Sequence, residues 1–229
     1  MKKRGKKYLE TAKNVDQTKS YSVQEAVDLV KKSSRKFNET VDMAVRLNVN
    51  PKKADQNVRG VLLLPHGTGK KVRICVVAKG EKYKEAEALE GVSAKGPEEF
   101  VQEVEKGKID FDVLIAAPDS MKELGRVAKI LGPKGLMPNP RSGTVTFEIR
   151  QIVEKLKKGQ YEFRVDVAGI LHLVAGKVSF DKEKLVENIQ EIIRVIQQVK
   201  PSSVKGQYVR SITLSSTMGP GISIASEIV

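Results

Sequence analysis

Pro65-His-Gly-Thr-Gly69 is the stretch at which the patterning of this 229-residue chain changes. Before it, apolar and polar residues alternate over residues 41–49, which predicts a strand with one buried and one available face, and residues 59–64 are expected to pair with it. After it come two continuous apolar runs, residues 74–78 and 113–117, which alternate with helical segments. Such runs are typical of parallel strands covered on both faces, so the stretch separates two kinds of sheet.

The alternating pattern returns beyond Gly159. Residues 161–167 alternate like the first strand, and a helix follows whose apolar residues share one side until Pro201 ends it. We therefore expect an α/β fold of two domains: a split α/β domain from residues 1–67 plus 159–229, and an inserted Rossmann-like parallel α/β domain of residues 68–158. Glycines lie at both crossings, either as a hinge or as ordinary loop residues, and both interpretations stay open.

Two capping boxes mark helix starts. Ser22-Val-Gln-Glu25 precedes apolar residues at helical spacing and predicts a helix from Ser22 to Lys32. Ser120-Met-Lys-Glu123 has the same form and predicts a helix start in the inserted domain.

The chain is strongly basic. It carries 41 lysines and arginines against 28 acidic residues, a formal net charge of +13, and its isoelectric point is about 9.7. The balance favours a polyanionic partner such as a nucleic acid; a charge that only keeps the protein dispersed is the alternative. Five basic residues near the amino terminus are expected to form a mobile tail that meets phosphate: Lys2, Lys3, Arg4, Lys6 and Lys7.

Cysteine usage and hydropathy exclude other classes of protein. Cys75 is the only cysteine and lies in an apolar run, which predicts a buried core residue, no disulfide and a reducing, cytoplasmic setting. No apolar run is long enough to cross a bilayer, so no membrane partner is expected.

No motif for enzyme chemistry is complete. Gly67-Thr-Gly-Lys70 lacks the earlier glycine and the following Ser or Thr of a phosphate loop, because Leu64 and Lys71 occupy those positions. His66 and His172 do not form an H-x-x-x-H pair for zinc. We expect no enzyme, no cofactor and no metal; a nucleotide-binding enzyme that uses the inserted domain is the alternative.

Two further segments carry candidate binding groups. Residues 131–144 are dense in glycine and proline, and they would either grip a phosphate chain through Lys134 and Arg141 or connect a helix rigidly to the next strand. Residues 211–221 begin as an alternating strand and break into a turn rich in hydroxyls and glycine. Hydroxyl donors, a methionine and bare backbone in one place suit RNA sugars and phosphates.

Five short strings stand out together: Lys36-Phe-Asn-Glu-Thr40, Asp55-Gln-Asn-Val-Arg-Gly60, Leu64-Pro-His-Gly67, Leu131-Gly-Pro-Lys-Gly-Leu-Met-Pro-Asn-Pro140 and Ser216-Thr-Met-Gly-Pro220. In this order and at this spacing they resemble the bacterial ribosomal protein L-one family, the stalk protein of the large subunit. The resemblance spans essentially the whole chain. It implies a hinged two-domain protein, monomeric when free, whose terminal domain binds the ribosomal RNA of the mobile stalk. It also implies that the protein assists release of exit-site tRNA and represses translation of its own operon by binding the mRNA leader.

By motif, the resemblance assigns the RNA surface to residues near the start of the first strand and the end of the last: Lys36, Phe37, Glu39, Thr40, Ser211, Thr217, Met218 and Gly219. Asp166, Gly169 and His172 are expected to reach the RNA as well. Near them the chain departs from the family's pattern, because Val167 replaces a residue that is commonly basic and Val174 one that is commonly proline. The lost positive charge would remove one phosphate contact.

These side chains have distinct expected roles. Phe37 would pack on a sugar or a base, with burial in the core as the alternative for Phe37 and Met218. Thr217 and Ser211 would bond to a 2′-hydroxyl. Glu39 would accept a hydrogen bond from a base amine or a hydroxyl, or else orient a neighbouring lysine.

Overall fold

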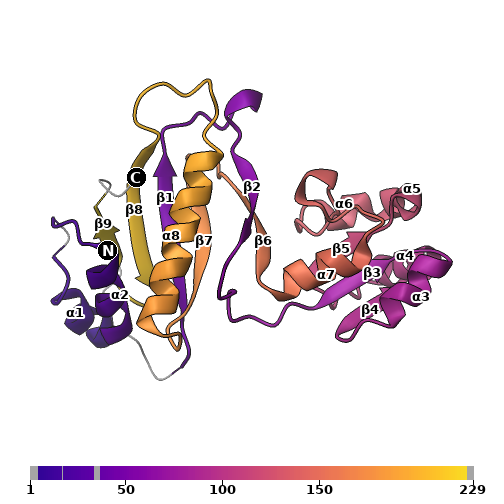
Figure 1. Cartoon of the computed structure of the whole chain (residues 1–229), viewed down its shortest axis with the longest axis horizontal. Coiled ribbons are helices and arrows are strands. Elements are labelled where there is room, and N and C mark those ends of the chain that lie inside the picture. The colour runs from indigo at the N-terminus through magenta and orange to yellow at the C-terminus, as the bar shows by residue number, and fades with distance from the viewer. Residues whose placement is uncertain (1–4, 17, 34–36, 226–229) are drawn as a thin grey trace. The chain divides into compact units, whose positions relative to one another are not determined.

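The computed structural model describes residues 5–16, 18–33 and 37–225. The chain divides into two compact units: the split unit, Met1–Gly69 with Gly159–Val229, and the inserted unit, Lys70–Lys158. Each unit combines helices with sheet (Figure 1), which confirms the α/β fold class.

The split unit is built on a four-stranded antiparallel sheet. Its strands are β1 (Thr40–Leu47), β7 (Ile170–Lys177), β8 (Val209–Ser216) and β9 (Ile222–Ile224), in the order β7-β1-β8-β9. Strand β1 therefore lies between β7 and β8, two strands from the far half of the chain.

The predicted partner of the first strand is wrong. Strand β2 (Arg59–Leu63), which follows the short 3₁₀ turn η1 (Ala54–Gln56), pairs with β6 (Gln160–Arg164) in a separate two-stranded sheet. Alternation in a sequence shows which face of a strand is buried, but it carries no information on which strand lies beside it. Strand β6 also ends earlier than predicted, and Val167 is 85% exposed in the turn that follows.

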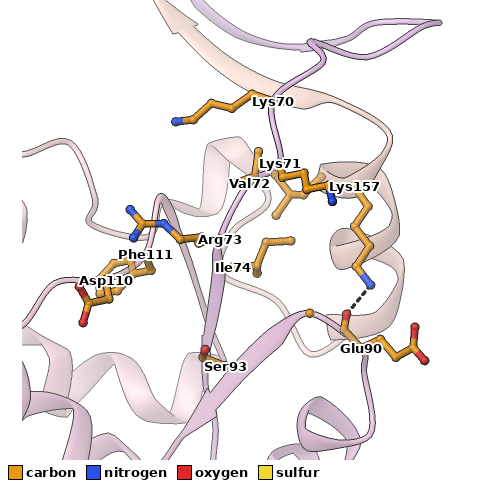
Figure 2. A pocket seen from close by; sticks show the side chains of 12 residues that line it. Lys70, Lys71, Val72, Arg73, Ile74, Glu90, Ser93, Asp110, Phe111 and Lys157 are labelled. Carbon is orange, nitrogen blue, oxygen red and sulfur yellow. Dashed lines mark hydrogen bonds between the residues drawn. The ribbon is translucent and has the colours of Figure 1, made fainter.

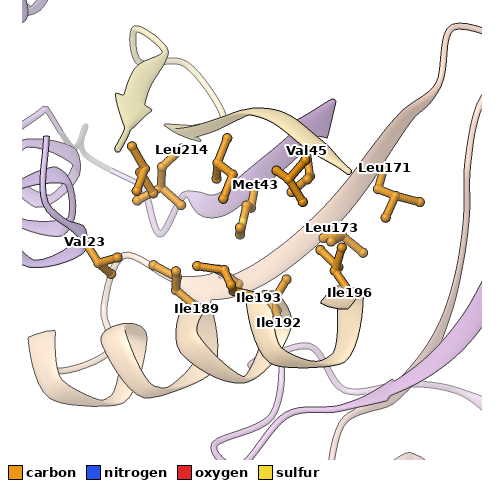
Figure 3. Packing of buried hydrophobic residues seen from close by; sticks show 14 of the residues in the cluster. Val23, Met43, Val45, Leu171, Leu173, Ile189, Ile192, Ile193, Ile196 and Leu214 are labelled. Carbon is orange, nitrogen blue, oxygen red and sulfur yellow. The ribbon is translucent and has the colours of Figure 1, made fainter. Parts of the chain in front are cut away.

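Two helices cover one face of the four-stranded sheet (Figure 1): α2 (Val23–Lys32) and α8 (Lys182–Gln198). The capping box at the start of α2 is confirmed, since the Ser22 hydroxyl accepts from the Glu25 N–H and the Glu25 carboxylate accepts from the Ser22 N–H. Figure 3 shows Met43 and Leu173 of the sheet pointing at Ile189, Ile192 and Ile193 of α8. This packing buries alternate residues over most of β1, β7 and β8 and leaves most of the residues between them on the opposite face.

Two of the basic residues expected in the amino-terminal tail, Lys6 and Lys7, lie in a helix. Helix α1 (Lys6–Ala12) begins at Lys6, within a run free of proline and internal glycine. Lys2, Lys3 and Arg4 lie outside the described residues.

The inserted unit contains a parallel three-stranded sheet in the order β4-β3-β5. Its strands are β3 (Ile74–Val77), β4 (Val92–Lys95) and β5 (Val113–Ala116), and the longer helices are α3 (Glu81–Glu87), α4 (Pro97–Glu105) and α7 (Ile149–Lys157). Residues of β3 alternate between two hydrophobic clusters, with Cys75 in one and Val76 in the other, as expected for strands covered on both faces. Burial raises the pKa of the Cys75 thiol to about 12, which fits an inert core residue.

A helix begins directly after Ser120, as predicted, but the capping box does not form there. Short helical turns follow one another here: η2 (Pro118–Ser120), α5 (Met121–Leu124), η3 (Gly125–Val127) and α6 (Ala128–Leu131). The backbone of Ser120 is already helical, with φ −85° and ψ −12°, whereas a capping residue needs an extended backbone. Its buried hydroxyl has no hydrogen-bond partner among the described residues.

Hydrogen bonds fasten the glycine- and proline-rich loop, residues 131–144, to β5. The Asn139 N–H donates to the Thr144 hydroxyl at 2.8 Å, and the Ser142 hydroxyl, at the end of η4 (Pro140–Ser142), donates to the Asn139 carbonyl at 3.0 Å. The Ala116 N–H donates to the Thr144 carbonyl at 2.9 Å. These bonds favour the rigid connector over the phosphate grip.

A buried asparagine of α8 joins the sheet to the segment that leads out of the split unit. The Asn188 amide nitrogen donates to the carbonyls of Ala175, at 2.8 Å, and Gly67, at 3.2 Å. Its oxygen accepts from the His66 N–H at 3.2 Å. Ala175 lies at the irregularity where the register between β1 and β7 shifts. The Asn188 side chain therefore hydrogen-bonds both the backbone of a β-bulge and the backbone at the start of the first crossing.

Replacing Asn188 by leucine should lower the free energy of unfolding by about 2–4 kcal/mol, because one buried carbonyl, one partly buried carbonyl and one N–H would lose their partner. Urea denaturation of the purified variant measures the loss. Gln190→Leu, at an exposed position on the same helix, is the matched control and should change stability by about 0.5 kcal/mol or less. Equal stability of the two variants would contradict a supporting role for Asn188.

Candidate nucleic-acid interface

The turn after β8 is held against the start of β1 by Thr217. Its hydroxyl accepts from the Thr40 N–H at 3.1 Å and donates to the Thr40 carbonyl at 3.3 Å. The Thr217 N–H donates to the same carbonyl at 3.1 Å. The structure thus brings together two predicted site residues that are 177 positions apart, and the Thr217 hydroxyl is engaged before any RNA arrives.

Glu39 is fully buried, so its carboxylate does not lie on the surface where an RNA-facing acceptor was expected. The Glu39 Oε2 accepts from the Met218 N–H at 3.1 Å. A Cβ added at Gly219 would lie 2.5 Å from the Ser216 hydroxyl, so any larger residue would require that hydroxyl to move. Glu39 and Gly219 therefore shape the turn that carries Met218.

Two large apolar side chains are exposed at this end of the sheet. Phe37 is 54% exposed and Met218 is 46% exposed, so neither is a core residue. Beside them the Lys177 ammonium donates to the Thr40 hydroxyl at 2.8 Å, which adds a cation that the sequence did not indicate. Lys36 lies outside the described residues. An apolar pair next to hydroxyls and a lysine suits the faces of bases or sugars and a phosphate.

Asp166 organises the turn at the opposite end of the sheet. Its carboxylate accepts from the N–H groups of Ile170, at 2.7 Å, and Ala168, at 2.9 Å, and lies 3.4 Å from the His172 Nε2. The Ile170 N–H is the main cause that lowers the pKa of Asp166, with smaller contributions from His172 and Ala168. Gly169 has φ +80° in this turn, and its carbonyl accepts from the Leu47 N–H.

Of the predicted site residues toward this end of the sheet, His172 and Ser211 have the side chains best placed to contact a ligand. The His172 side chain is 68% exposed, whereas Asp166 and Gly169 are engaged in the turn. Ser211 is exposed on β8, opposite Arg46 of β1. The predicted site residues thus form two groups at the two ends of the sheet.

The face of the sheet away from α2 and α8 connects these groups. From Thr40 to Arg46 the central strand rises about 20 Å at the usual 3.3 Å per residue. The side chains between them that point away from the helices belong to Asp42 and Ala44 of β1, flanked by Thr213 and Ser215 of β8. We call this surface, with the two groups at its ends, the polar face.

A model of the Ribosomal protein L1p/L10e family matches residues 29–220. The match covers most of the chain, including the whole inserted unit and both groups of the polar face. The chain belongs to the Ribosomal protein L1p/L10e family. Membership makes it a structural, rRNA-binding constituent of the large ribosomal subunit, associated with the ribosome, and not an enzyme. The nucleotide-binding enzyme considered from the sequence is thereby excluded.

The inserted unit of this L1p/L10e protein contains a pocket of about 770 Å³ (Figure 2). Its lining includes Ile74 at the start of β3 and Phe111 just before β5, so it opens at the amino ends of the parallel strands. Ligands of such sheets bind beyond the carboxyl ends, and the pocket therefore has the wrong location for a dinucleotide.

Asp112 of this L1p/L10e protein is paired with two basic side chains. It lies 3.2 Å from both the Lys70 ammonium and the Arg73 Nε. Hydrogen bonds from Arg73 are the main cause that lowers the pKa of Asp112 to about 2.

Two structural features are absent from residues 5–16, 18–33 and 37–225. No group of three or more His, Cys, Asp or Glu side chains is arranged to hold a metal ion among those residues. Within the same residues, none of the helices of this L1p/L10e protein combines the length and the apolar character that crossing a membrane requires.

Proposed function

We propose that this protein binds the ribosomal RNA of the mobile stalk through the polar face of the split unit, with residues 1–67 plus 159–229 as the RNA-binding domain. The observation that carries the proposal is the exposure of Phe37 and Met218, which are close in sequence to the hydrogen-bonded pair Thr40 and Thr217. Large exposed apolar side chains at a hydroxyl-rich turn have no use in folding, but they give bases and sugars a surface on which to pack.

Specificity and attraction come from different groups in this proposal. The hydroxyls of Ser211 and Thr217 can bond to 2′-hydroxyls, which distinguishes RNA from DNA. The net charge of +13 steers the protein to any nucleic acid and makes affinity fall as salt rises. Because the polar face would recognise shape and sugars, an mRNA leader that presents the same shape would compete for it. We therefore propose that the protein represses its own operon through the polar face when ribosomal RNA is scarce.

A second surface of the split unit supports a contact with exit-site tRNA. Arg59 and Arg164 are exposed and directly opposite each other on β2 and β6. Like charges in this position destabilise a strand pair, so a phosphate partner would compensate for a placement that folding does not favour. We propose that this pair takes part as the protein assists tRNA release, in the cytoplasm and on the ribosome.

A glycine cluster supports movement of the inserted unit on a hinge. Gly67, Gly69 and Gly159 all have positive φ and lie at the two chain crossings. Glycine adopts such backbone angles without strain, and it can absorb changes in them when two units reorient.

Phe37→Ala should weaken binding to a stalk rRNA transcript by about tenfold or more, since one stacked base contributes about 1–3 kcal/mol. Thermal unfolding should stay close to that of the wild type, because the ring is largely exposed. Phe147→Ala is the matched control, an aromatic ring that is 50% exposed in the inserted unit, and it should leave affinity unchanged. Filter binding across a salt series measures both. Equal affinities for the two variants would move recognition away from the polar face.

Cosedimentation with large subunits from cell extract distinguishes a ribosomal constituent from a repressor that acts only on free mRNA. We expect the protein in the large-subunit fraction. Its recovery in the soluble fraction alone would favour the repressor.

A further inference from the structure

We propose that a hollow in the middle of the polar face is a pocket for one unstacked nucleobase, whose amino group donates to the carboxylate of Asp42. The inference rests on the proposed function, because it names the part of the RNA that this face would recognise. It adds base recognition to an interface that otherwise offers hydroxyls and apolar surface.

The hollow has a volume of about 310 Å³ and is lined by Asp42, Ala44, His172, Val174 and Ser215, among others. The small side chain of Ala44 lies in register between His172 and Thr213. The polar face is therefore hollowed at Ala44, because the side chains on either side of it are larger. Small-molecule sites begin near 300 Å³, and a hollow at this lower limit fits one base rather than a longer ligand.

The strand register explains why these side chains meet. Figure 3 shows Met43 and Leu173 pointing toward α8. Their sequence neighbours Asp42, Ala44 and His172 therefore point to the opposite face. The register between β1 and β7 shifts at Val41 and Asp42, and such irregularities commonly redirect a side chain near a binding site.

Asp42 has the features of an acceptor kept for a ligand. No hydrogen bond or ion pair to its carboxylate occurs within residues 5–16, 18–33 and 37–225, although the side chain is half-buried. Burial raises the pKa of Asp42, and the charge of Lys177 opposes that shift only in part. A partly desolvated carboxylate without a partner costs folding free energy, and an incoming N–H donor would offset that cost.

The chemistry of the lining selects a base with an amino group. A carboxylate accepts from the N4 amine of cytosine, and the amines of adenine and guanine offer a comparable donor. The exposed imidazole of His172 can stack on a base that has left its helix, and the Ser215 hydroxyl can donate or accept. Uracil presents two carbonyl oxygens around its single N–H and would place one of them against Asp42.

The location of the hollow fits a strand of RNA that contacts both ends of the polar face. Thr40 and Thr217 lie at one end, and Ser211 and His172 lie toward the other. A single strand that spans the distance of about 20 Å between the ends passes over Asp42. A base turned inward at that point would enter the hollow.

The test uses the full-length protein and a stalk rRNA transcript, with Asp42→Asn compared with Glu162→Gln. Both substitutions remove one negative charge, and Glu162 is exposed on β6 outside the hollow. Electrostatics alone would make both variants bind RNA more tightly. We expect Asp42→Asn to bind at least tenfold more weakly, with a melting temperature no lower than that of the wild type. Unchanged or tighter binding by Asp42→Asn would overturn the proposal.

Uridine substitution at each unpaired position of the transcript identifies the base. One position should weaken binding to the wild-type protein by at least tenfold but change binding to Asp42→Asn by less than threefold. If no position shows this coupling, the pocket does not hold a base. If the wild-type protein itself does not bind the transcript, while a control RNA-binding protein does, the proposed function fails instead.

Discussion

Thr217→Val should weaken binding to a stalk rRNA transcript by about ten- to a hundredfold. Valine keeps the shape of threonine but removes the hydroxyl, so a 2′-hydroxyl would lose its partner in the complex at a cost of about 1–3 kcal/mol. The same change removes the acceptor of the Thr40 N–H, which now lies 3.1 Å from the Thr217 hydroxyl. Isothermal titration across a salt series measures the loss, which should be similar at each salt concentration because no charge is removed.

Thr217→Ser is the control that separates the hydroxyl from the fold of the turn. Serine can accept from the Thr40 N–H and bond to RNA, so its affinity should stay within about threefold of the wild type, well under 1.4 kcal/mol. Circular dichroism and thermal unfolding check that both variants fold. If the folded valine variant bound as tightly as the serine variant, Thr217 would have no direct or positioning role in RNA binding.

The parts of the fold that depend on local pattern could be predicted from the sequence. The continuous apolar run at residues 74–78 correctly indicates a parallel strand, and the capping box at Ser22 correctly indicates a helix start. Each of these signals is made by residues within a few positions of one another. The partner of β1 could not be predicted, since β1 pairs with strands more than 120 residues further along the chain. Which strands lie beside β1 depends on how the whole split unit packs on α8.

The candidate site shows the same division. The hydroxyls of the turn around Thr217 and the apolar side chain of Met218 could be located from residue types alone. The burial of Glu39 could not, because glutamate is seldom fully buried and its partner, the Met218 N–H, is distant in sequence. Lys177 has no distinguishing local pattern, and only the register that sets it opposite Thr40 brings it into the interface. Asp42 likewise could not be recognised as a candidate from the sequence, because the hollow beside it is formed with the strands on either side of β1.

Gly159→Ala should lower the free energy of unfolding by about 3 kcal/mol or more. Gly159 has φ +102°, and an added Cβ would lie 2.5 Å from the Cα of Gly67 and 3.2 Å from the Thr68 nitrogen. These are backbone atoms, so a side-chain rotation cannot relieve the clash, and the two crossings would have to separate. The backbone angle and the displacement each cost about 1–3 kcal/mol. Urea denaturation of the full-length protein measures the sum.

Gly107→Ala isolates the contribution of the backbone angle. Gly107 has φ +81° but no heavy atom within 4 Å of an added Cβ, so its alanine variant should lose only about 1–2 kcal/mol. The excess loss at Gly159 then reports the contact between the crossings, which lies within the split unit. Equal losses at the two positions would show that the crossings separate freely. In that case the contact between the two crossings would not anchor the proposed hinge. Of the restraints described above, the hydrogen bonds from Asn188 to His66 and Gly67 would then remain on the first crossing.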